Sequence, residues 1–217
     1  MRIQIVSAVV AFGLGLVLVA CGGSQVTGAP AGQAQPPAGQ SPAVQQGNRL
    51  TAYEAYQRLL PKIKGWQPKA TIAIGQPKEP SNGQGKLGLD GRSAAWQFIC
   101  ASPDEQAYAL FEIDTSKEAK SQVRVGTSNV RRPAVTALVD PAAWKVDSSQ
   151  ALEIAQANGL KEWLAKHTAY DAADTVLELR ASAEEGAYWR ITAHEGADTI
   201  DFRISAADGK VYFARSH

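Results

Sequence analysis

The sequence has few of the side chains on which most enzymes and metal sites depend. A Gly-x-Ser-x-Gly nucleophile motif is missing. A Gly-x-Gly-x-x-Gly pattern at residues 83–88 follows a Pro/Ser/Asn-rich stretch and not a strand, so it predicts a hairpin loop and not a dinucleotide site. We therefore expect no catalytic residue, no metal, no cofactor and no enzymatic activity. The histidines are too scattered for a metal motif: His167, His194 and His217.

A net charge of one sign is also missing. The chain has 22 Lys and Arg against 21 Asp and Glu, a formal net charge of +1. Proteins that bind nucleic acid or an anionic bilayer surface need a basic patch. The composition therefore indicates that the main partner is not nucleic acid.

The one long apolar run lies at the N-terminus, after Arg2. It covers residues 5–20 and is shorter than the roughly 20 residues that a membrane-spanning helix needs. It ends in Leu18-Val19-Ala20-Cys21, which resembles the lipobox of bacterial lipoproteins. The resemblance implies that residues 1–20 are a lipoprotein signal peptide and that the Cys21 thiol carries a diacylglycerol lipid.

Cysteine usage limits how the folded part is held together. The sequence has only two cysteines, so lipidation of Cys21 leaves Cys100 without a partner for a disulfide within the chain. Cys100 has the same strand parity as Trp96 and Phe98. We expect it to lie in the core as an unreactive, small apolar residue.

Residues 21–48 form a low-complexity segment rich in Gly, Pro, Gln and Ala, with no charged or aromatic side chain. Such a segment buries too little apolar surface to fold, so we expect a disordered tether with a reach of about 30 Å. Gly22, and not Asp, follows Cys21, so nothing favours retention in an inner membrane. We expect a lipid-anchored protein on the extracytoplasmic side of the cell membrane or outer membrane.

Two helix starts divide the remaining chain. Thr51 and Glu54 have capping-box spacing, and Pro61 is expected to kink or end the helix that follows. A similar start at Asp147 leads to a helix that Asn158-Gly159 should close.

Strand-like alternation follows each helix start and places apolar residues on one sheet face and charged residues on the other. The fold class is therefore α+β, with two related units at residues 49–135 and 136–217. Each unit is expected to pack a helix on a small antiparallel sheet, with the charged face open to solvent. The alternating apolar residues are Ile72/Ile74, Trp96/Phe98/Cys100, Ala109/Phe111/Ile113, Thr175/Leu177/Leu179, Trp189/Ile191/Ala193 and Ile200/Phe202/Ile204.

The two units match each other in sequence. Ala95-Trp96-Gln97-Phe98 corresponds to Tyr188-Trp189-Arg190-Ile191, which indicates an internal repeat. The second unit also resembles the PepSY family of small exported domains, through the helix opening at Ser148–Ala155, the Tyr188-Trp189-Arg190-Ile191 strand and the Asp-Gly turn within residues 204–211. The resemblance implies a fold and the binding of a peptide or peptidase, but no catalytic residue. A generic exported α+β repeat is the alternative.

Binding is the function that these patterns favour. Arg180, Arg190 and Arg203 alternate on the charged face and are candidates for contacting an acidic partner. Edge strands of small sheets can also pair with an extended peptide. We expect a binding module for an exported protein or peptide, with modulation of a peptidase as one form of that role. The alternative is a structural or assembly lipoprotein of the cell envelope without a small-molecule site, and the sequence leaves the oligomeric state open.

Overall fold

The computed structural model describes residues 48–116, 122–126 and 130–217, without the side chains of residues 122–126. The signal peptide (1–20), Cys21 and nearly all of the tether (21–48) lie outside the described residues. None of the helices in the described part of the chain is both long and apolar enough to cross a membrane.

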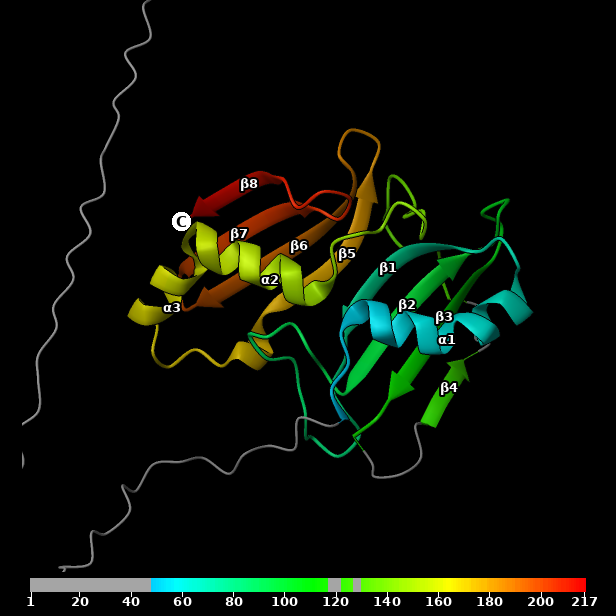
Figure 1. Ribbon diagram of the computed structural model, residues 1–217, viewed down its shortest axis with the longest axis horizontal. Coiled ribbons are helices and arrows are strands. Elements are labelled where there is room, and N and C mark those ends of the chain that lie inside the picture. The colour runs from blue at the N-terminus through cyan, green and yellow to red at the C-terminus, as the bar shows by residue number, and fades with distance from the viewer. Residues whose placement is uncertain (1–47, 117–121, 127–129) are drawn as a thin grey trace, which may run out of the picture. The chain divides into compact units, whose positions relative to one another are not determined.

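The described chain is an α+β fold with one antiparallel sheet of eight strands, in the order β4-β3-β2-β1-β5-β6-β7-β8 (Figure 1). The fold class is confirmed at this level. The strands are β1 (Thr71–Pro77), β2 (Ala95–Ala101), β3 (Tyr108–Asp114), β4 (Gln122–Gly126), β5 (Val176–Ser182), β6 (Gly186–Glu195), β7 (Asp198–Ser205) and β8 (Val211–Ser216).

The sheet is continuous where the sequence predicts two separate sheets. The first strand after each helical region pairs with its counterpart, β1 with β5, through Gly75 opposite Leu179. A Cβ on Gly75 would lie 2.8 Å from the Phe98 ring, so only glycine allows the strand to lie this close to the core at the join. Two sheets joined edge to edge hide two strand edges that would otherwise be exposed.

The helices lie on one face of the sheet, α1 (Ala52–Trp66) over the β1–β3 region and α2 (Ser148–Ala155) over β6 and β7 (Figure 1). Pro61 does not end the first helix, because it lies inside α1 with its ring exposed to solvent. Asn158 and Gly159 break the second helical region, as expected, and beyond this kink, within Gln156–Leu160, a third helix begins, α3 (Lys161–Lys166).

The core lies between these helices and the sheet. Trp96, Phe98 and Cys100 are fully buried there, so the expected inward orientation of that strand is confirmed. Burial raises the pKa of the Cys100 thiol to about 12, which keeps it protonated and unreactive. The expectation that the face opposite the helices is open to solvent is wrong for the first half. There, residues after β4 add a second, smaller cluster, in which Val135 and Leu138 pack against Ala101 and Tyr108.

Both halves of the chain repeat one contact between the sheet and the helix start. The Trp96 indole N–H donates to the Leu50 carbonyl over 2.9 Å, and the Trp189 indole N–H donates to the Val146 carbonyl over 2.8 Å. Each carbonyl belongs to the residue before a helix N-cap. The strand register also matches, since Trp96 lies opposite Ile113 and Trp189 lies opposite Ile204.

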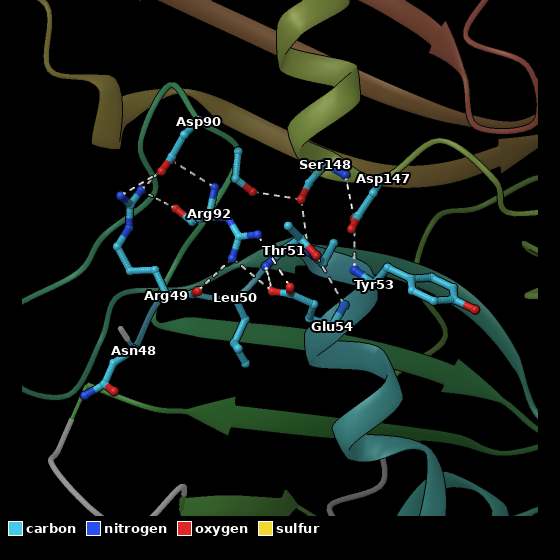
Figure 2. Close-up of polar contacts among 12 residues, drawn as sticks. Asn48, Arg49, Leu50, Thr51, Tyr53, Glu54, Asp90, Arg92, Asp147 and Ser148 are labelled. Atoms are coloured by element: carbon cyan, nitrogen blue, oxygen red, sulfur yellow. Dashed lines mark hydrogen bonds and ion pairs between the residues drawn. The ribbon is translucent and has the colours of Figure 1, made fainter. Parts of the chain in front are cut away.

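The two helix starts also touch each other (Figure 2). The Asp147 carboxylate accepts from the Ser148 backbone N–H of its own helix (2.6 Å) and from the Tyr53 N–H of α1 (2.9 Å). The Ser148 hydroxyl accepts from the Ala52 N–H and donates to the Gly91 carbonyl. Gly91 has φ of +70° and a Cβ on it would lie 2.5 Å from the Ser148 carbonyl oxygen, so this position requires glycine.

Ion pairs surround this junction on the α1 side (Figure 2). The Arg49 guanidinium makes a bidentate ion pair with the Asp90 carboxylate, with N···O distances of 2.8 and 3.1 Å. Arg92 lies 3.1 Å from the Glu54 carboxylate, which also accepts from the Thr51 N–H in the predicted capping box. These charges are therefore partnered within the fold and hold the start of α1 against the β1–β2 loop.

We expect Trp96→Ala and Trp189→Ala to destabilise the protein to a similar degree. Each substitution removes a fully buried indole and its hydrogen bond, and should lower the free energy of unfolding by about 3–5 kcal/mol. Urea denaturation measures the loss. Tyr53→Ala is the matched control. Because Tyr53 is 41% exposed, its substitution should lower the free energy of unfolding clearly less. A small loss at only one of the two tryptophans would contradict their equivalence.

We also expect Asp147→Ala to lower the free energy of unfolding by more than the loss of one helix N-cap does. A lost N-cap typically costs about 1 kcal/mol, and Asp147 accepts from the N–H groups of two helices. The comparison is Thr51→Ala, which removes the N-cap of α1 alone. Unfolding midpoints should fall further for Asp147→Ala, by about twice the Thr51→Ala loss. Equal losses would show that Asp147 stabilises only its own helix.

Candidate functional site

The open face of strands β5–β8 carries the arginines predicted from the sequence. Arg190 and Arg203 lie directly opposite each other in the β6/β7 register, and Glu178 lies opposite Arg190 on β5. Glu178 is shared between Arg180, at 3.7 Å, and Arg190, at 3.5 Å. The structure therefore gathers the three arginines on one surface that also contains a carboxylate, which sequence alternation alone did not place between them.

Arg203 has its own partners at the end of this surface. Its guanidinium lies 3.4 Å from the Glu185 carboxylate and 5.6 Å above the Tyr188 ring. The Arg190 and Arg203 side chains are still 44% and 50% exposed. Exposed ion pairs contribute about 0–1 kcal/mol, so an acidic partner can compete with these internal contacts at little cost.

Strand β8 is an edge strand of the sheet (Figure 1) and pairs with β7, the strand that carries Arg203. The pairing with β7 is irregular between Arg203 and Ile204, so one extra residue of β8 is inserted there. Tyr212 and Phe213 lie at this bulge and are 37% and 38% exposed. The edge strand thus presents two aromatic side chains to solvent beside Arg203.

A groove of about 430 Å³ lies on the other side of β8, below α3. Ile200 and Phe202 of β7 lie at its floor and Trp163 at its wall toward the helix, and all three side chains are almost entirely buried. The break at Asn158 and Gly159 redirects the chain above it. The remaining lining residues are polar or small: Asn158, Gly159, Glu162, Lys166, His167, Asp198, Ala214, Arg215, Ser216 and His217.

His167 connects the groove to the β6/β7 turn. Its Nδ1 lies 2.8 Å from the Trp163 carbonyl oxygen, and its Nε2 lies 3.1 Å from the Asp198 carboxylate. The imidazole ring also stacks on the Trp163 indole, with the ring centroids 3.9 Å apart. The Trp163 carbonyl contact and the Asp198 carboxylate raise the pKa of His167. No local pattern in the sequence indicates this pair, because His167 and Asp198 are 31 positions apart.

The remaining expectations from the sequence concern the glycine-rich pattern, Cys21 and the metal ligands. The 83–88 glycine pattern lies in the loop between β1 and β2, as expected, with no helix after it. Cys21, the expected lipid attachment site, lies outside the described residues. Within the described ranges, no three His, Cys, Asp or Glu side chains are grouped as metal ligands would be.

Comparisons with known proteins give little beyond this geometry. No protein-family model matches the chain, and no curated protein matches it. One similar solved structure is the crystal structure of a "putative lipoprotein" from Clostridium difficile 630. It is 11% identical, with a TM-score of 0.44, over 75% of this chain and 93% of that chain.

We expect the protonated form of His167 to stabilise the fold. Since its pKa in the folded protein is raised above the ordinary value of about 6.5, this contribution is complete below that value and is lost as pH rises through the folded pKa. His167→Gln should therefore lower the urea midpoint more at about pH 5.5 than at about pH 8.5. His194→Gln, on the exposed face of β6, is the control. An equal loss at both pH values would contradict the assignment.

Proposed function

We propose that the protein is a lipid-anchored, extracytoplasmic binding module for an exported protein or peptide. The observation that carries the proposal is the surface at the β8 end of the sheet. There, Arg190 and Arg203, two exposed aromatic side chains and a free strand edge lie together, and Arg180 extends the same face on β5. Aromatic and arginine side chains supply much of the binding energy in protein interfaces.

The anchor part of the proposal rests on the lipobox and on Cys21. A lipid at Cys21, followed by a flexible tether, would hold the folded part near a membrane and leave its surface accessible to exported proteins. The place of action would then be the extracytoplasmic side of the cell membrane or outer membrane.

The two-unit part of the proposal rests on the matched contacts of Trp96 and Trp189. We infer that residues 49–135 and 136–217 are related helix-plus-sheet units whose sheets have joined. The matched register and the matched indole bonds support this inference. Modulation of a peptidase is a narrower proposal and rests only on the PepSY resemblance of the second unit.

The anchor is tested by Cys21→Ala in a bacterial host. The original chain should be processed, should carry diacylglycerol on Cys21 by mass spectrometry and should partition into detergent. Without the thiol, neither lipid attachment nor lipoprotein processing can occur, so the variant should remain unprocessed. A variant that is processed and still partitions into detergent would refute the lipid assignment.

The binding role is tested by crosslinking the full-length, lipidated protein in envelope preparations. We expect one or a few exported proteins to be captured in stoichiometric amounts. Arg190→Glu combined with Arg203→Glu should reduce the yield by about tenfold, because both cations leave the surface. Arg58→Glu, on the exposed side of α1, is the matched control. If the chain crosslinks only to copies of itself, the structural or assembly role replaces the binding role.

A further inference from the structure

We propose that the partner adds to β8 as a ninth strand, and that its residues alternate between apolar side chains facing the groove and acidic side chains facing the arginine surface. This inference deepens the proposed function, on which it rests, by naming the segment that the site would accept. Three observations support it: the direction of the free hydrogen-bonding groups, the shape of the groove and the charge of β8.

The free hydrogen-bonding groups belong to alternate residues of β8. His217 and Thr199 exchange two backbone hydrogen bonds, at 2.9 and 3.3 Å, so they form a hydrogen-bonded pair of the β7/β8 ladder. In an antiparallel ladder every second pair is of this kind, so Arg215 also directs its backbone toward β7. The N–H and C=O groups of Ala214 and Ser216 must then point to the free edge.

The groove accepts the side chains of a strand added at that edge. Ala214 lies opposite Phe202 and Ser216 lies opposite Ile200, so both side chains face the helix side of the sheet, as their partners do. Both are small, and the groove below α3 extends past them to Trp163. Residues of an added strand that pair with Ala214 and Ser216 would place their side chains in this groove.

The alternate side chains of an added strand would meet a cationic surface. Residues 210–217 contain Lys210, Arg215 and His217 but no Asp or Glu. Phe213 and Arg215 lie on the open face, opposite Arg203 and Asp201. Arg215 has no ion-pair partner in the described part of the chain. An acidic side chain of the partner next to Arg215 would gain a cation that makes no ion pair within the described part of the chain.

The test uses fluorescent synthetic peptides and the full-length, lipidated protein in detergent micelles. One peptide alternates glutamate with valine and phenylalanine, a second has lysine in place of glutamate, and a third has the first composition in blocks. Fluorescence anisotropy should show binding of the alternating acidic peptide, and at least about tenfold weaker binding of the other two. No binding of the acidic peptide up to about 1 mM would overturn the inference.

Two variants connect binding to β8. Ala214→Pro removes an N–H that points to the free edge and spares the β7 ladder, so it should weaken acidic-peptide binding by about tenfold. Circular dichroism and the unfolding midpoint check that the variant is folded. Arg215→Glu leaves the backbone unchanged and should reverse the preference, so that the lysine peptide binds better than the glutamate peptide. Arg58→Glu should change neither affinity.

The outcomes distinguish failure of the ninth-strand inference from failure of the proposed binding function. If envelope partners are captured and Ala214→Pro and Arg215→Glu have no effect on binding, the partner uses another surface and only the ninth-strand inference fails. If Ala214→Pro instead dissociates a dimer of the protein, a second copy occupies β8 and the inference is also overturned. If the envelope crosslinking yields no partner, the proposed function itself fails.

Discussion

The Asp147 carboxylate links the helix starts of the two halves of this fold. The helices α1 and α2 begin side by side, and every helix start has backbone N–H groups that need acceptors. Asp147 supplies an acceptor to both, and its negative charge lies where the positive ends of two helix dipoles meet. Ser148 adds a second link, from α1 through its hydroxyl to Gly91. These contacts fasten the two helix starts to each other, on the same sheet whose two parts are joined by the pairing of β1 with β5.

The joining of the two halves through β1 and β5 determines which strands are the edges of the sheet. With β1 paired to β5, the outer strands are β4 and β8. An exposed edge is prone to unwanted pairing, and proteins commonly protect it with bulges and cations. β8 has both, through the inserted residue near Tyr212 and through Lys210 and Arg215. The same features that hinder pairing with a second copy of a cationic strand would favour pairing with an acidic one.

The groove below α3 arises from two local departures from the first half. The first helix runs without interruption from Ala52 to Trp66, whereas Gly159 adopts φ of +117° and redirects the second helical region. At the sheet edge, Ala214 and Ser216 are small where the neighbouring strand has Phe202 and Ile200. A redirected helix above and short side chains below leave space, and the paired His167 and Asp198 are part of its lining.

Local patterns were sufficient to predict both capping boxes, the Trp96 and Trp189 strands, and the sheet parity that gathers the arginines on one face. Such features depend on residues a few positions apart. The alternation in Gln122–Gly126 could also have revealed β4, which the sequence analysis missed. The joining of two sheets into one, the capping of two helices by Asp147 and the groove beside β8 depend on contacts between distant parts of the chain. The Asp147 contact joins residues 94 positions apart, and no periodicity or local spacing encodes a hydrogen bond over that separation.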